Sequence, residues 1–195
     1  VAEGCQYAVM EVSSHALDQG RVDGCHFDAA VFTNLTQDHL DYHGTMENYL
    51  AAKKKLFTMC DRGVVNWDDP ASARIREGID CPFVTFSATQ DAADYTARNI
   101  HKRPDGVDFE LVGTGDIDRV RLPIPGDFSV YNAMAAAACA LAIGLPFDKV
   151  VAALCSCKGV KGRAEIVPTG RDFTIVIDYA HTPDGLLNIC RTLKE

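Results

Sequence analysis

Residues 29–44 read AAVFTNLTQDHLDYHG, a short apolar run that passes directly into a polar loop. Residues 7–12 read YAVMEV, a similar run that also leads into polar residues. Such runs are typical of parallel strands buried on both faces, and α/β proteins place their ligands at the C-terminal ends of these strands. We therefore expect an α/β fold with a ligand site where the two runs end.

The rest of the sequence continues the alternation of strands and helices. Apolar spacing and turn residues predict, in chain order, a helix over 45–59 with Thr45 as N-cap, a strand over 63–66, a short helix after Asp69-Pro70, a strand over 81–86, and helices over 129–143 and 147–155. Two runs near 109–112 and 120–124, separated by turn residues, predict a small antiparallel β section. The expected architecture is a mostly parallel sheet flanked by helices.

A charged connector with two glycines, residues 158–163, is the predicted domain boundary. Beyond it we expect a strand over 174–178 and a helix over 183–195. The chain starts without Met and stops inside that helix, so we expect a piece of a larger protein. One domain is predicted over 1–162 and the start of a second over 163–195.

Charge and cysteine content argue against several classes of protein. The chain has 19 Lys and Arg against 27 Asp and Glu, a formal net charge of −8, whereas nucleic-acid partners bind basic faces. No apolar stretch approaches the roughly 20 residues of a membrane span, so no membrane partner is expected. The 8 cysteines lack a disulfide framework or zinc-ligand spacing, which favours a reducing, cytoplasmic setting.

The loop over 36–44 is the densest group of candidate functional residues, with two His and two Asp. These side chains can bind a hard cation or act as a general base, although a polar loop with helix-capping aspartates has the same composition. Glu11 stands at the end of the other apolar run. It is either an ordinary strand terminus or, together with His39, part of a Mg²⁺ site.

Two further places carry side chains of interest. Lys53, Lys54 and Lys55 have the spacing of a solvated helix face, whereas Asp178 and His181 lie in a strand-to-helix turn that can face a ligand. The sequence has no Walker A motif, no GxGxxG and no metalloprotease motif. The residues alone therefore predict a cation or nucleotide site and name no reaction.

Three motifs resemble those of the Mur ligases: residues 10–15 (MEVSSH), 33–44 (TNLTQDHLDYHG) and 178–184 (DYAHTPD). The resemblance covers nearly the whole chain. It is closest to the members that add the third residue of the peptidoglycan stem peptide, the MurE type. It implies the later part of the family's central ATPase domain and the first strand and helix of its Rossmann-like C-terminal domain.

The resemblance implies ATP-dependent formation of an amide bond, in which ATP phosphorylates a carboxylate and an amine displaces the phosphate. Two Mg²⁺ ions would offset the charge that gathers there. The family's Mg²⁺ ligands match Glu11, His39 and Lys53, and Lys53 matches the lysine that is carbamylated in the family. The contacts to the UDP-sugar match Ser13, Gln19 and Arg21. The contacts to ATP match Asn132, Arg163 and Asp178, with His181 beside them.

The implied substrates are UDP-N-acetylmuramoyl-dipeptide and a diamino acid, either meso-diaminopimelate or L-lysine, with meso-diaminopimelate favoured as the commoner choice in the family. The family's phosphate-binding loop is missing from this sequence, so we expect the chain alone not to turn over ATP. Two alternatives are a folylpolyglutamate or cyanophycin synthetase type of ligase and a non-catalytic nucleotide-binding module. The UDP-sugar matches argue against the first and the Mg²⁺ matches against the second.

Overall fold

A computed structural model describes residues 3–194 of the chain, and the described strands form two sheets. The larger sheet has six strands in the order β1-β2-β3-β4-β5-β6, which span Phe27–Phe32, Cys60–Asn66, Phe83–Ser87, Tyr95–Arg103, Gly106–Val112 and Ile117–Leu122. The smaller sheet is an antiparallel pair, β7 (Glu165–Val167) and β8 (Ile175–Ile177).

The first four strands of the larger sheet are parallel, and β5 and β6 continue it in antiparallel fashion. The predicted α/β fold with a mostly parallel sheet and a small antiparallel section is therefore confirmed. Strand β4 lies outside the predicted elements. Its sequence is rich in basic and polar residues, because much of its outer face is exposed, and this composition hides the apolar signal of a strand.

The described helices are α1 (Ser14–Asp18), α2 (Leu40–His43), α3 (Met46–Lys54), α4 (Ser72–Arg76), α5 (Asp127–Ala142), α6 (Phe147–Cys155) and α7 (Pro183–Thr192). Five of them, α3 to α7, lie close to the predicted positions, whereas α1 and α2 lie outside the predicted elements. A 3₁₀ turn over Lys55–Thr58 extends α3, and the Thr45 side chain caps α3 by accepting from the N–H of Asn48 at 3.2 Å. The predicted helix over 183–195 ends at Thr192, and its last residue, Glu195, lies outside the described residues.

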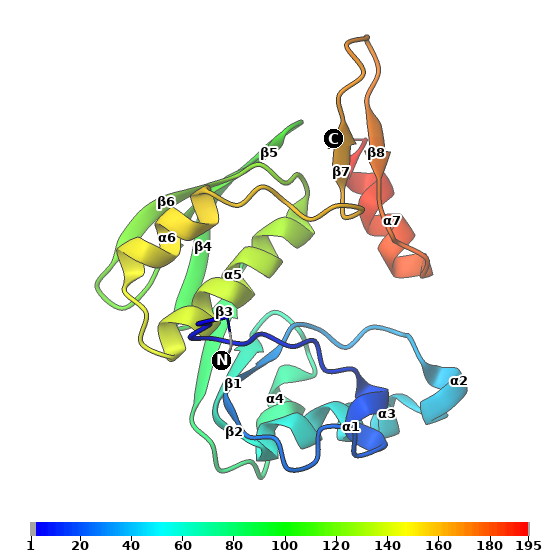
Figure 1. Ribbon diagram of the computed structural model, residues 1–195, viewed down its shortest axis with the longest axis vertical. Helices are drawn as coiled ribbons and strands as arrows, with labels where there is room; N and C mark the ends of the chain where they lie inside the picture. The colour runs from blue at the N-terminus through cyan, green and yellow to red at the C-terminus, as the bar shows by residue number, and fades with distance from the viewer. Residues whose placement is uncertain (1–2, 195) are drawn as a thin grey trace.

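Helices cover both faces of the parallel strands (Figure 1). Helix α5 packs against β1 to β5 on one face, and α3 and α4 lie on the other. The neighbours Val64 and Val65 on β2 point to opposite faces, and both are fully buried. Val64 joins the core cluster that contains Met134 of α5, while Val65 joins the cluster that contains Ile75 of α4.

The predicted strand over 7–12 is wrong. This segment is an irregular trace that leads into α1 (Figure 1), and within the described residues it makes no hydrogen bond to a strand. Tyr7, Val9 and Met10 are 60%, 99% and 53% exposed. An apolar run becomes a strand only where a neighbouring strand satisfies its backbone N–H and C=O groups, and composition cannot report that neighbour.

Strands β7 and β8 and helix α7 form a group at one side of the larger sheet (Figure 1). The predicted strand over 174–178 is present as β8. Its partner β7, which is only three residues long, lies outside the predicted elements. The boundary between residues 162 and 163 stays a prediction. Across residues 3–194, no helix has both the length and the apolar character needed to cross a membrane.

Candidate active site

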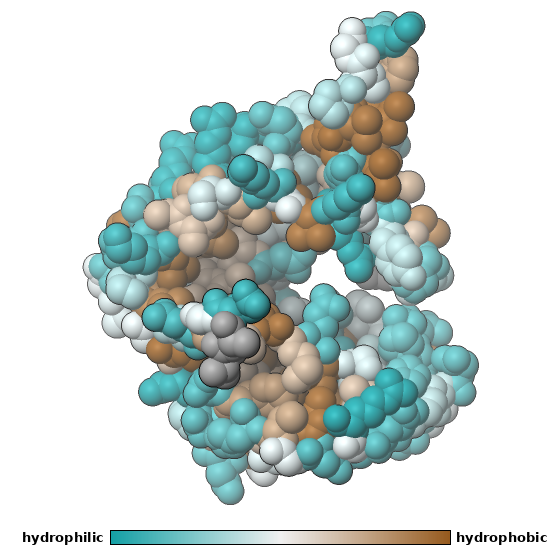
Figure 2. Space-filling view, in the orientation of Figure 1, coloured by the Kyte–Doolittle hydropathy of each residue, from teal (hydrophilic) through white to brown (hydrophobic). Residues whose placement is uncertain are grey.

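A cavity of about 380 Å³ lies at the C-terminal ends of β1, β2 and β3. One wall is made by the residues that follow these strands, and the other by the start of α5 and by α7. The polar lining residues are Thr33, Asn34, Thr36, Asn66, Asp68, Asp69, Asp127, Tyr131, Asn132, Asn188, Arg191 and Thr192. Figure 2 shows the surface opening between the part that carries α7 and the part that carries the strand ends. Asn132, a predicted ATP contact, faces this cavity.

One carboxylate in the cavity wall, Asp68, joins three elements. Its Oδ1 accepts hydrogen bonds from the hydroxyls of Ser87 and Thr89, both at 2.6 Å. Its Oδ2 accepts from the N–H of Ala88 at 2.8 Å and from the hydroxyl of Tyr131 at 3.0 Å. Burial raises the pKa of Asp68, but these hydrogen bonds outweigh it and hold the pKa below its usual value. Burial, together with the Asp68 carboxylate, raises the pKa of Tyr131 to about 12, so the phenol remains a donor.

The turns after β1 and β2 are tied to each other by two side chains. The amide of Asn66 donates to the carbonyl of Thr33 at 2.9 Å. The carboxylate of Asp69 accepts from the N–H of Leu35 and from that of Ala71, both at 2.8 Å. These bonds fix the start of the loop that leads to the predicted metal ligand in α2's N-cap position.

That ligand, His39, and Lys53 both lie near the ring of Tyr49. The His39 ring is 6.0 Å from the Tyr49 ring, and the Lys53 Nζ atom is 5.0 Å from the centre of the Tyr49 ring. His39 has a φ of 54°, a left-handed conformation that costs a non-glycine residue of order 1 kcal/mol. Burial lowers the pKa of Lys53, although the carboxylates of Asp69 and Asp38 oppose the shift.

Glu11 is not brought to these two residues by any contact within residues 3–194; it lies on the exposed segment before α1. In the same described part of the chain, no group of three or more His, Cys, Asp and Glu side chains has a geometry that could hold a metal ion. Of the three predicted Mg²⁺ ligands, His39 and Lys53 therefore share Tyr49 as a neighbour, whereas no contact among the described residues joins Glu11 to either of them.

The three predicted UDP-sugar residues lie at the two ends of α1. The Ser13 hydroxyl caps the helix by accepting from the N–H of Ala16 at 3.2 Å. Gln19 follows the last turn, where its amide oxygen accepts from the Arg21 guanidinium at 2.5 Å and its amide nitrogen donates to the Tyr42 hydroxyl at 3.3 Å.

Helix α1 also connects these residues to His39. The ring of His15 in α1 lies 4.8 Å from the His39 ring and 4.2 Å from the Tyr42 ring. The predicted UDP-sugar residues and His39 thus belong to one continuous group of side chains.

The other predicted ATP contacts gather around Tyr179. The guanidinium of Arg163 lies 5.1 Å from the centre of the Tyr179 ring. The centre of the His181 ring is also 5.1 Å from the centre of the Tyr179 ring. Both Asp178 oxygens are engaged by backbone N–H groups, those of Ala164 and Ala180, at 2.7 Å each. Arg163 also lines a second cavity of about 370 Å³, which Asn132 does not line.

Asp68 and Tyr131 are two members of the first cavity wall that sequence reasoning misses. The signal that draws attention to the loop over 36–44, polar residues directly after an apolar run, is also present where residues 63–66 pass into Trp67-Asp68-Asp69. Applying that signal at every strand end would find Asp68. Nothing in the sequence marks Tyr131, because it lies within an alanine-rich helix and meets Asp68 only in the fold.

Comparisons with known proteins agree on one family. The family described as the Mur ligase middle domain matches residues 1–140. A relative from Bacillus licheniformis, named UDP-N-acetylmuramoyl-L-alanyl-D-glutamate–2,6-diaminopimelate ligase, is 47% identical over 207 residues, which cover 100% of this chain and 42% of the relative. A relative of the same name from Caldanaerobacter subterraneus is 49% identical over 196 residues, covering 100% of this chain and 40% of the relative.

The solved structures agree with the sequences. A structure of UDP-N-acetylmuramoyl-L-alanyl-D-glutamate–2,6-diaminopimelate ligase superposes with a TM-score of 0.85 at 35% identity, covering 99% of this chain and 41% of that one. A MurF structure from Acinetobacter baumannii superposes with a TM-score of 0.79 at 26% identity, covering 86% of this chain and 37% of that one. The chain therefore spans about two fifths of the length of the proteins that it matches.

Proposed function

Because the chain belongs to the Mur ligase family, we propose that it forms part of an ATP-dependent ligase that joins diaminopimelate to UDP-N-acetylmuramoyl-L-alanyl-D-glutamate. The names of its relatives support this substrate pair. The complete reaction belongs to a protein of the relatives' length, of which this chain supplies about two fifths. Its place is the synthesis of peptidoglycan precursors in the cytoplasm.

The reaction has two steps. The γ-phosphoryl group of ATP passes to the side-chain carboxylate of the glutamate, which gives an acyl phosphate and ADP. The amine of diaminopimelate then attacks the acyl carbon, and inorganic phosphate leaves. Glu11, His39 and Lys53 would hold Mg²⁺, which would offset the negative charge that gathers where the triphosphate meets the carboxylate.

Lys53 becomes a suitable ligand when its Nζ atom forms a carbamate. The neutral amine attacks CO₂ and loses a proton, so that the side chain changes from a cation to an anion. A lowered lysine pKa favours this step because it increases the neutral fraction. The single observation that carries the proposal is this half-buried lysine, which lies near the Tyr49 ring as His39 does, in a chain of this family.

The remaining matched residues bind the two large substrates. Arg21, which donates to Gln19 just after α1, is suited to the pyrophosphate of the UDP-sugar because a guanidinium forms paired hydrogen bonds with phosphate oxygens, and Ser13 lies at the other end of α1. For ATP, Asn132 faces the strand-end cavity, while Arg163, Asp178 and His181 lie on the C-terminal segment. If the C-terminal segment closes over the strand-end cavity, Asn132 and the three residues of that segment would contact the same nucleotide.

The carbamate is tested by carbon-13 NMR of the chain in ¹³C-labelled bicarbonate. We expect one carbamate resonance in the wild-type chain and in Lys54→Arg, which changes the next lysine along the same helix. Lys53→Arg keeps the positive charge but cannot form a stable carbamate, so the resonance should disappear. A resonance that persists in Lys53→Arg would show that Lys53 is not the modified residue.

The substrate is tested by calorimetric titration with UDP-N-acetylmuramoyl-L-alanyl-D-glutamate and, separately, with a reduced folate. We expect heat from the UDP-linked dipeptide alone, and an affinity about tenfold weaker in Arg21→Ala, since one charged hydrogen-bonding partner is lost. Arg62→Ala, which removes an exposed arginine from β2, is the matched control. Preference for the folate would instead support the folylpolyglutamate type of ligase.

A further inference from the structure

Two cysteine thiols meet at the N-terminal end of the parallel sheet, the end opposite to the strand-end cavity. Cys60 is the first residue of β2, and Cys81 lies just before β3. Their sulfur atoms are 3.9 Å apart, within the range of a thiol hydrogen bond. Neither residue lines either of the two cavities described above.

The backbone holds these two residues side by side. Strands β2 and β3 are parallel neighbours in which Gly63 pairs with Phe83, and the N–H of Gly63 donates to the carbonyl of Pro82 at 2.9 Å. The sulfurs must approach by roughly 2 Å to reach a disulfide bond length, a movement of the size that side-chain rotation provides. Among residues 3–194, no other two cysteine sulfurs are within hydrogen-bonding distance of each other.

We propose that Cys60 and Cys81 form an oxidisable dithiol, a modification site that peroxide converts to a disulfide. The two thiols differ in access to the oxidant: Cys60 is buried, whereas Cys81 is partly exposed. Burial raises the pKa of Cys60 to about 12, with Cys81 contributing, so Cys60 stays a thiol. Cys81 is therefore the thiol that reacts first.

The oxidation balances with peroxide as the only co-reactant. The Cys81 thiolate attacks one oxygen of hydrogen peroxide, the O–O bond breaks, and the products are a sulfenic acid and hydroxide. The Cys60 sulfur then attacks the Cys81 sulfur, the S–O bond breaks, and the departing hydroxide takes the Cys60 proton to become water. Two thiols are oxidised, and one peroxide is reduced to two molecules of water.

The disulfide would join the two ends of the segment over 60–81, which supplies part of one wall of the strand-end cavity. Between the two cysteines lie strand β2, helix α4 and the turn that joins them, which carries Asn66, Asp68 and Asp69. Closing a loop restricts the unfolded chain more than the folded one. The oxidised chain should therefore unfold several degrees higher than the reduced chain.

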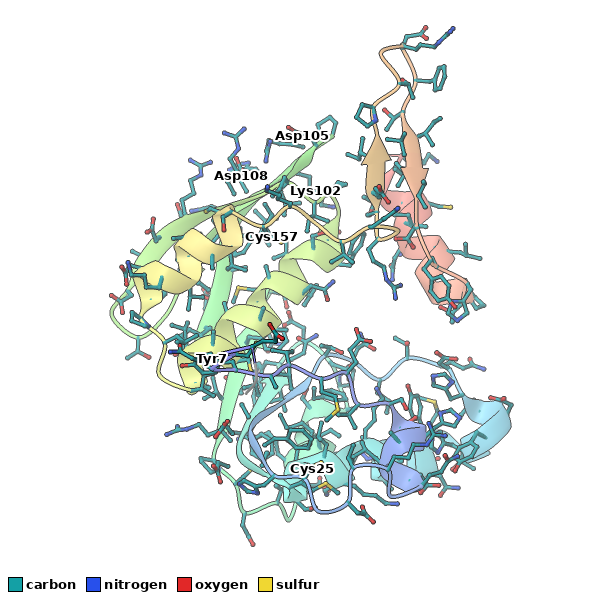
Figure 3. All side chains as sticks on the ribbon, viewed as in Figure 1. Tyr7, Cys25, Lys102, Asp105, Asp108 and Cys157 are labelled. Atoms are coloured by element: carbon teal, nitrogen blue, oxygen red, sulfur yellow. The ribbon has the colours of Figure 1, made fainter. Side chains whose placement is uncertain are left out.

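The experiment is mild peroxide treatment of the 195-residue chain, followed by intact mass measurement and peptide mapping. We expect a loss of about 2 Da, for two hydrogens, and a linked peptide that contains Cys60 and Cys81. Cys25→Ser is the matched control: Cys25 lies on the same lobe as β2 and α4 (Figure 3) and is exposed, and this variant should still form the link.

Two variants keep the test decisive even if one of them folds poorly. In Cys60→Ser the sulfenic acid has no partner, so dimedone should label Cys81. In Cys81→Ser the loss of about 2 Da should disappear, and Cys60 should remain unlabelled because it is buried. Linkage of Cys60 to Cys25, or equal labelling of Cys60 and Cys81 in the folded wild-type chain, would overturn the proposal.

Discussion

Asp68 shows how much of the cavity wall depends on one side chain. Replacing it with Asn puts an amide N–H₂ group among the donors of Ser87, Thr89 and Ala88, so at least one hydrogen bond is lost. We expect Asp68→Asn to lower the free energy of unfolding by about 2–3 kcal/mol near pH 7, the usual cost for a hydrogen bond to a charged group. Urea denaturation measures this difference.

The cost of Asp68→Asn should also depend on pH. The folded-state pKa of Asp68 is lower than its unfolded value, so its stabilisation is complete above pH 3.8 and is lost as the pH falls through the folded-state pKa. The difference between wild type and variant should therefore shrink in acid. Asp91→Asn, which breaks an exposed ion pair with Arg98, should cost at most about 1 kcal/mol. A pH-independent difference for Asp68→Asn would contradict this explanation.

Asn132 provides a residue-scale test of nucleotide binding. Its side chain faces the cavity, and the chain's one tryptophan, Trp67, follows the lining residue Asn66, so its fluorescence can report a bound nucleotide. Asn132→Ala should weaken ADP binding by about fivefold to tenfold, the loss of one hydrogen bond.

The control for this titration is Asn99→Gly, which removes an exposed amide from β4. Asn99 has a φ of 49°, which glycine adopts without strain. Equal loss of ADP affinity in Asn132→Ala and Asn99→Gly would show that the cavity is not where the nucleotide binds.

The sequence predicts part of the candidate site and misses part of it for a physical reason. The loop of His39 is conspicuous because its polar residues are adjacent in the chain. Lys53, by contrast, has the pattern of a solvated face, and the sequence singles it out only through the family resemblance. In the structure it lies near the Tyr49 ring, and burial lowers its pKa. Burial of a single long side chain depends on what packs over it, which local sequence does not report.

At the scale of elements, Gly63 on β2 is required by its neighbour on β3. A Cβ atom there would lie 2.3 Å from the ring of Phe83, which itself packs 5.5 Å from the ring of Phe57. We expect Gly63→Ala to lower the free energy of unfolding by about 1–3 kcal/mol, because the ring must move within a filled core. Chemical denaturation measures the loss.

A second substitution tests whether the ring is the cause. Phe83→Leu removes the ring atoms that the new methyl group of Gly63→Ala would contact. The double variant Gly63→Ala with Phe83→Leu should therefore lose less stability than the sum of the two single variants. Strict additivity would mean that Gly63 is needed for its backbone and not for the space that it leaves.

The longer helices are predicted well from this sequence, whereas the short α1 and α2 are not predicted. Helix α6 has the predicted bounds, and the Thr45 cap and the start of α7 at Pro183 also agree, since caps and helical periodicity are local properties. A strand depends on a partner that is distant in the chain. That dependence explains both the unpredicted β4 and the run over 7–12 that forms no strand.

At the scale of the whole molecule, the cavity exists because α7 lies against the start of α5. Gly126, the N-cap of α5, has a φ of 94°, and a Cβ atom there would lie 2.6 Å from the ring of Phe128 and 2.7 Å from the Thr192 hydroxyl oxygen of α7. The sequence between α5 and α7 contains no pattern that predicts this contact. The close approach of the two helices therefore comes from the structure alone.

Substituting this glycine tests whether the contact with α7 holds the two parts together. Gly126→Ala introduces backbone strain and a clash with Thr192 of α7 and with the Phe128 ring of α5. Gly144→Ala introduces only the strain, because Gly144 has a similar φ of 88° and no atom near the position of a Cβ. Both variants should lose about 1–2 kcal/mol of stability. Only Gly126→Ala should also lose amide hydrogen-exchange protection in α7 and, with its wall displaced, affinity for ADP. Equal protection of α7 in the two variants would mean that the helix is held by contacts other than its approach to Gly126.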